Sequence, residues 1–157
     1  SFEEENEVLE KDISNFQNIN FLVQPSKKLA LESLDSCESY IDVIIAKVQN
    51  ITKDYQQGEE QRANENFADA LETIDLFTQL VTRINKTLAQ QFDEEFKKPE
   101  SIQKLEIHLL SILKTMIPAR EDNDIIMLCD LLEYELIDNL KEWKTKAIPE
   151  LKKMRDS

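Results

Sequence analysis

The chain has 157 residues, 41% of them hydrophobic, a length and composition that suit one domain with a sizeable core. It has 1 glycine and 4 prolines, too few turn residues for an all-β fold. Its formal net charge of −13 disfavours nucleic acid and anionic membrane surfaces as partners.

Residues 1–24 form an N-terminal appendage ahead of the first long helix. Its first ten residues include five glutamates, which suit the first turns of a helix. Residues 18–23 are largely apolar and precede a proline, which favours an extended segment. The apolar residues that would share one helical face are Phe2, Leu9, Ile13 and Phe16. We therefore expect a helical or extended appendage that covers part of the bundle.

Two long helices, 26–57 and 59–92, follow the appendage. Apolar residues recur at alternating steps of four and three from Ala30 to Tyr55 and again from Ala63 to Leu88. This alternation predicts one apolar stripe along each helix. The single glycine, Gly58, stands between the two stripes and suits a left-handed helix cap. The sequence therefore predicts an antiparallel hairpin of two matched helices.

Two further helices are predicted at 99–117 and 121–148. Pro99 suits a first helical position, and Pro118 and Pro149 are taken as stops. The third helix carries an apolar stripe that is widened by Leu110, Leu113 and Ile117. With the hairpin, these helices predict an all-α fold: an antiparallel up-down four-helix bundle over residues 25–157.

The helix at 26–57 carries more apolar residues than a two-helix seam requires. Tyr40, Val43 and Ile45 lie beside its main stripe and are the candidate partner-binding residues. The surplus apolar width of this helix and of the third predicts a non-enzymatic protein-interaction module. We expect a protein partner, or self-association, through an apolar helical face, with a chaperone or adaptor for a helical partner as the concrete form.

Paired carboxylates give the enzymatic alternative. All-α nucleotide pyrophosphohydrolases hold magnesium with acidic residues three apart on neighbouring helices. Glu72 and Asp75, with Glu135 and Asp138, have that spacing. No glycine-rich or lysine-rich phosphate cradle accompanies them, and acidic pairs at this spacing are common on helix surfaces. The Mg-dependent hydrolase therefore remains the second hypothesis.

The remaining reactive residues favour structural roles. The only histidine, His108, lacks the Glu-x-x-His spacing of a di-iron bundle. Cys37 and Cys129 fall on apolar stripes, which predicts reduced core residues. We expect no metal and no cofactor. The absence of a signal peptide and of an apolar run of about 20 residues predicts a cytoplasmic protein that does not enter a membrane.

The last part of the chain is basic and has a recognisable motif. Six Lys and Arg residues lie between 141 and 155, where they suit the dipole of a helix C-terminus, with phosphate binding as the alternative. The stretch Asp130-Leu-Leu-Glu-Tyr-Glu-Leu136, followed by Lys141-Glu-Trp-Lys144, resembles the tail of a family of small uncharacterised bacterial helical-bundle proteins. That resemblance implies a bacterial, cytoplasmic protein and carries no known activity.

Overall fold

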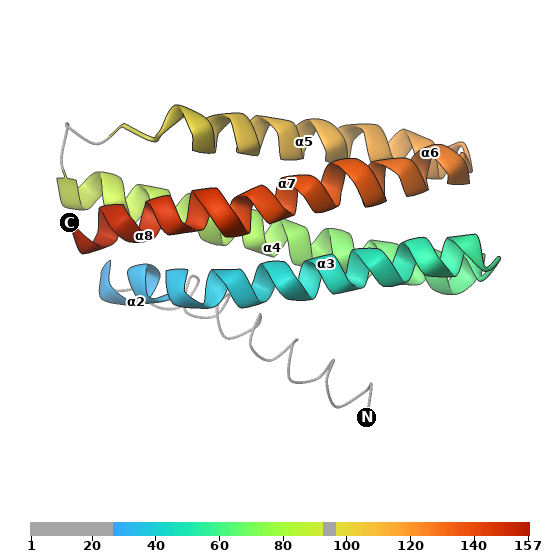
Figure 1. Cartoon of the computed structure of the whole chain (residues 1–157), viewed down its shortest axis with the longest axis horizontal. Coiled ribbons are helices and arrows are strands. Elements are labelled where there is room, and N and C mark those ends of the chain that lie inside the picture. The colour runs from blue at the N-terminus through green and yellow to red at the C-terminus, as the bar shows by residue number, and fades with distance from the viewer. Residues whose placement is uncertain (1–26, 93–96) are drawn as a thin grey trace, which may run out of the picture.

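The computed structural model describes residues 27–92 and 97–157, and every element within these ranges is a helix. The first four helices are α2 (Lys27–Glu32), α3 (Leu34–Gln56), α4 (Glu60–Phe92) and α5 (Glu100–Glu121). They are followed by α6 (Ile125–Asp130), the π-helix η2 (Leu131–Leu136), α7 (Ile137–Glu142), the π-helix η3 (Trp143–Ala147) and α8 (Ile148–Asp156). The last five segments run on as one continuous helix, here named the C-terminal helix (Figure 1). The all-α class is confirmed for the described residues, and the appendage predicted at 1–24 lies outside them.

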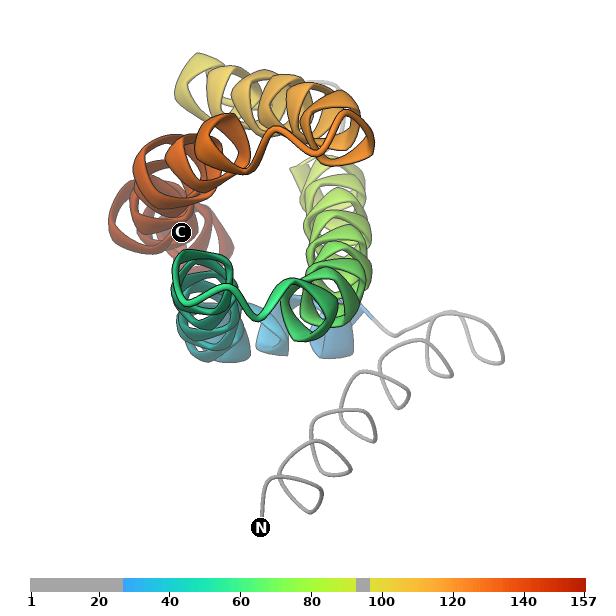
Figure 2. The same ribbon diagram turned by 90° about the vertical axis from the view of Figure 1, so that its right-hand side faces the viewer.

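The helices pack around a shared core. Seen end-on, α3 and α4 lie next to each other, and α5 and the C-terminal helix occupy the remaining two sides (Figure 2). The predicted stripe residues from Leu34 to Tyr55 and from Ala63 to Leu88 are all buried. Trp143 and Phe77 meet edge to face at the centre, with ring centroids 5.7 Å apart. The heptad spacing therefore identified the core faces of both long helices.

The turn between α3 and α4 is built on Gly58, as predicted. Gly58 has a φ of +79°, a conformation that residues with a Cβ rarely adopt. Its N–H donates to the Tyr55 carbonyl at 3.2 Å, and the Glu59 N–H donates to the Asp54 carbonyl at 2.9 Å. These bonds satisfy carbonyls that the end of α3 would otherwise leave free.

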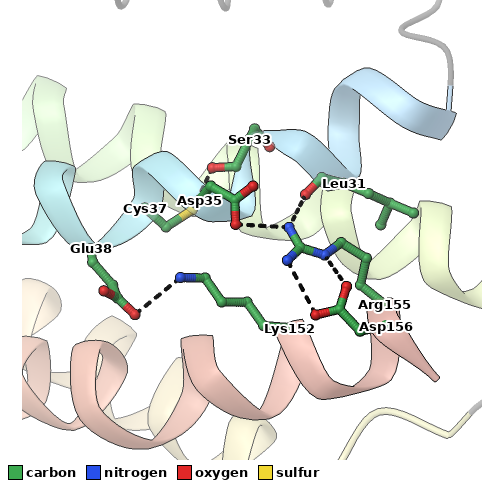
Figure 3. A network of polar contacts seen from close by, with 8 residues as sticks. All are labelled: Leu31, Ser33, Asp35, Cys37, Glu38, Lys152, Arg155 and Asp156. Carbon is green, nitrogen blue, oxygen red and sulfur yellow. Dashed lines mark hydrogen bonds and ion pairs between the residues drawn. The ribbon is translucent and has the colours of Figure 1, made fainter.

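The predicted helix 26–57 is wrong in one respect, because it breaks at Ser33 into α2 and α3. The Ser33 carbonyl accepts from the Ser36 N–H at 3.1 Å, a tight bond between residues three apart, and from Sγ of Cys37 at 3.4 Å. The Leu31 carbonyl accepts from Arg155 of the C-terminal helix at 3.0 Å (Figure 3). The break is therefore stabilised by a residue more than 100 positions away, which local sequence does not reveal.

Two predicted boundaries that rest on prolines are also wrong. The helix predicted at 99–117 continues past Pro118 to Glu121, and the one predicted at 121–148 begins at Ile125 and ends at Asp156. Pro118 lies exposed in the last turn of α5, so the hydrogen bond that the proline removes is at the end of the helix and only three residues follow it. Pro149 follows η3, in which the Ile148 N–H donates to the carbonyl of Trp143, five residues back. This wider turn lets the helix pass the proline ring.

Three ion pairs join the C-terminal helix to α3. Lys144 donates to Asp42 at 2.7 Å, Lys152 to Glu38 at 3.3 Å and Arg155 to Asp35 at 3.0 Å (Figure 3 shows the last two). Half of the basic residues predicted to complement a helix dipole therefore have carboxylate partners on another helix. Because the pairs are partly exposed, they orient the two helices more than they stabilise them.

Arg155 is the pair member with the most contacts, since it also binds the Leu31 carbonyl at the α2–α3 break. We expect Arg155→Ala to lower the free energy of unfolding by about 1–2 kcal/mol, because it removes charge-assisted hydrogen bonds to a part-buried acceptor. Amide hydrogen exchange in α2 should also accelerate. Urea denaturation and exchange measured by mass spectrometry check both effects.

The control is Lys153→Ala, which removes an exposed cation with no ion pair among the described residues. It should change stability by no more than about 0.5 kcal/mol. Equal effects of the two substitutions on α2 exchange would contradict the role of Arg155.

Candidate functional site

Large exposed apolar side chains occur on only two elements in the described part of the chain. On α5, Ile107 is 70% exposed, Leu110 50% and Ile117 48%. On the C-terminal helix the exposed residues are Ile126, Met127 and Tyr134. No side chain of this kind is exposed on the described parts of α3, α4 or α8. An uneven distribution of this sort is typical of a surface that binds another protein.

A pocket of about 420 Å³ lies between α4 and α5 beside the exposed residues of α5. Its apolar lining is Leu71, Phe77 and Val81 from α4, Leu109, Leu110, Leu113 and Ile117 from α5, and Trp143 from η3. Its polar lining is Asp75, Thr78, Thr82, Glu106 and Lys114. We name this surface the α4–α5 groove. Over α5 it adjoins a shallower depression that reaches Ile107.

Polar contacts hold α5 in place near Glu106. The Glu106 carboxylate accepts from Asn85 of α4 at 3.3 Å and from Lys98 at 2.8 Å. On the other side of α5, Asn139 of α7 donates to the Leu105 carbonyl at 3.3 Å. These contacts fix α5 to both neighbours at one level, and the groove extends from Glu106 towards Ile117.

Trp143 forms part of the groove and has an unsatisfied donor. Its side chain is 1% exposed, and Nε1 has no hydrogen-bond partner among the described residues. A buried donor without an acceptor costs about 1–3 kcal/mol.

The charges around the groove are unequally paired. Glu106 is neutralised by Lys98, and Asp75 accepts from Gln79 at 2.8 Å. Lys114 is exposed, and within residues 27–92 and 97–157 it has no ion pair. The groove therefore combines apolar walls with one cation available to an acidic group.

The candidate partner-binding residues predicted from sequence lie on another helix. Tyr40, Val43 and Ile45 are half-buried on α3, and Ile45 packs against the core. None of them lines the α4–α5 groove. The residues that widen the stripe of the third helix do line it, so the surplus apolar width of that helix was the sequence signal for the groove.

The paired carboxylates lie on two helices. Glu72 and Asp75 are exposed on α4, whereas Glu135 and Asp138 are exposed on η2 and α7. Across the described ranges, no three His, Cys, Asp or Glu side chains approach closely enough to hold one metal ion. The two pairs are therefore not assembled into a shared site.

The cysteines are buried and unpaired, as predicted. Burial raises the pKa of Cys37 to about 12, and Asp35 and Glu38 act in the same direction while Lys152 opposes them. Burial also raises the pKa of Cys129. Both thiols are therefore protonated near neutral pH and poor nucleophiles. His108 is exposed, with Nδ1 3.2 Å from Nδ2 of Asn139.

Comparison with known proteins places the groove inside a defined family region. None of the helices in residues 27–92 and 97–157 is long and apolar enough to cross a bilayer. Searches of curated proteins and of solved structures find no match to the chain. The family described as "Domain of unknown function (DUF8042)" matches residues 32–146, which include every residue that lines the groove. The chain therefore belongs to this family of unknown function, as the resemblance of its tail implied.

Proposed function

We propose that this protein is a non-enzymatic interaction module that binds an amphipathic helix of a protein partner in the α4–α5 groove. The observation that carries the proposal is the coincidence of the groove with Leu110 and Ile117, two of the six large apolar side chains that are exposed in the described structure. A chaperone or adaptor for a helical partner is the form of function that this surface suits.

Recognition would follow the helix-in-groove mode. An entering helix presents apolar residues at steps of three and four, and these would contact the apolar walls given by α4 and α5. The bound helix would then pack against α4 and α5 as a fifth helix of the bundle, supplied by the partner. An acidic residue on that helix could pair with Lys114, the unpaired cation of the groove.

The direction of the helices and the cellular location of the protein belong to the same proposal. We propose that neighbouring helices of the bundle run in opposite directions. The three ion pairs support this for α3 and the C-terminal helix, because Lys144, Lys152 and Arg155 pair with Asp42, Glu38 and Asp35, so that the numbers rise along one helix as they fall along the other. We also propose a cytoplasmic, bacterial protein. The two unpaired cysteines and the resemblance of the tail support this. Neither nucleic acid nor a membrane is expected as a partner, given the net charge of −13.

The test compares two glutamate substitutions on α5. Leu110→Glu places a charge on the groove, where binding would have to desolvate it. We expect proteins captured from the host extract by the full-length chain to be lost, with affinity reduced at least about tenfold, or about 1.4 kcal/mol. The melting temperature should stay nearly unchanged because Leu110 is half exposed.

Gln103→Glu is the matched control, since it adds the same charge at an exposed position of α5 outside the groove. It should retain every protein that the wild type captures. Light scattering of the three proteins distinguishes a foreign partner from self-association. Capture that survives Leu110→Glu unchanged would refute the proposed role of the groove.

A further inference from the structure

The chain itself carries a candidate occupant for the α4–α5 groove. Twenty-six residues precede the described structure, and they include Phe2, Leu9, Ile13 and Phe16, which would share one face of a helix. They enter the described structure at Lys27, the first residue of α2.

The starting point lies beside the helix that forms one side of the groove. Because the chain breaks at Ser33, α2 packs against α4 as well as against α3. Figures 1 and 2 place α2 at the end of the bundle where α4 ends. The groove begins at Thr82 of α4, ten residues before that end, which corresponds to about 15 Å along the helix.

The dimensions also agree. As a helix, the stretch from Phe2 to Phe16 would measure about 21 Å, and the groove residues of α4, from Leu71 to Thr82, cover about 16 Å. The ten residues from 17 to 26 span at most about 33–36 Å when extended, about twice the 15 Å along α4 between its end and the groove. The remaining length is available for the chain to pass around α4, because α2 packs against α3 and α4 while the groove lies between α4 and α5.

Lys114 offers this occupant one charged contact, although Asp75 in the same lining carries a negative charge. Residues 1–16 contain six acidic side chains and one lysine. The groove offers Lys114 without an ion pair in the described structure, while Glu106 is already paired with Lys98. An acidic amphipathic segment can therefore pair with the free cation while its apolar face covers the apolar walls.

We propose that residues 1–16 of this chain occupy the α4–α5 groove in cis, so that a helical partner has to displace them. This inference rests on the proposed function, because both assign a helix to the same groove. It makes residues 1–16 an internal competitor that lowers the apparent affinity for partners by the fraction of time the groove is occupied. These residues lie outside the region matched by the family, 32–146.

The test is disulfide formation within the full chain. One variant carries Asp12→Cys and Thr78→Cys, which pairs a position at the edge of the segment's apolar face with a residue that lines the groove. The control carries Asp12→Cys and Ser39→Cys, with the second cysteine exposed on α3. Mild oxidation followed by peptide mass mapping identifies the bonded pairs, and the buried Cys37 and Cys129 report on specificity.

We expect the groove pair to form an intramolecular disulfide at least tenfold faster than the control pair, at a rate independent of protein concentration. Adding Phe16→Asp should slow the groove pair to the control rate, because it places a charge on the apolar face. Equal rates for the two pairs would overturn the inference, and so would cross-linked dimers, which would assign the groove to a second copy.

The two proposals fail separately. If the groove pair does not cross-link but Leu110→Glu still abolishes capture, only the cis inference is lost. If the groove pair cross-links but Leu110→Glu leaves capture unchanged, the groove is occupied by residues 1–16 and the proposed binding of a partner in the groove is refuted.

Discussion

Replacing Trp143 with alanine should lower the free energy of unfolding by about 3–5 kcal/mol, the range expected for truncating a buried aromatic residue. Trp143 is among the largest side chains with almost no exposed surface, and it packs edge to face against Phe77. Its removal leaves a cavity where α4, α5 and η3 meet. Urea denaturation followed by far-ultraviolet circular dichroism measures the effect, because the variant has no tryptophan left to monitor.

The control is Tyr134→Ala on the same helix, which removes an aromatic ring that is 63% exposed. It should change stability by no more than about 0.5 kcal/mol. If Trp143→Ala costs less than about 1 kcal/mol, the central packing described above is incorrect.

Raising the pH above 9 should destabilise the wild type more steeply than Cys37→Ala. Burial raises the pKa of Cys37 from 9.0 to about 12, so between these values the folded chain holds a proton that the unfolded chain loses. The contribution of this thiol to stability is therefore complete below pH 9 and is lost as the pH rises towards 12. The expected difference in slope approaches about 1.4 kcal/mol per pH unit.

Urea midpoints of both proteins at pH 8, 9, 10 and 11 test this expectation. The pKa of Tyr55 is also raised by burial, but that residue is present in both proteins and cancels in the comparison. Thiol labelling at pH 8 gives an independent check, since Cys37 should react rapidly only after unfolding. Parallel pH profiles would mean that Cys37 does not titrate as a buried group.

The two long helices α3 and α4 and the turn between them could be predicted from sequence because their determinants are local. Gly58 is the only residue without a Cβ, and heptad spacing alone selects the buried face of each helix. The break at Ser33 could not be predicted, because the carbonyl it frees is bound by Arg155 from the other end of the chain. The helix ends predicted from Pro118 and Pro149 were wrong for a related reason. Whether a helix continues past a proline depends on the solvent exposure of the proline and on the geometry of the neighbouring turns.

Only part of the candidate site could be predicted from the sequence. The extra apolar residues of the third helix, Leu110 and Ile117, were apparent from spacing, but so were Tyr40 and Val43 on the first. The spacing of apolar residues shows which face of one helix they share. It contains no information about which neighbouring helix covers that face. The structure leaves Leu110 and Ile117 exposed and Tyr40 and Val43 half-buried, a difference set by how the four helices pack.

The two π-helical segments bear on how tolerant the chain is to changes in length. In η2 the Ile137 N–H donates to the Leu132 carbonyl, five residues back, as Ile148 does to Trp143 in η3. Each segment therefore holds one more residue than an α-helical turn needs, and deleting one would let the turn close as an α-helix with both flanking faces still directed at the core. The same deletion in the uninterrupted α4 would rotate every later side chain by about 100° and turn half of its apolar stripe towards solvent.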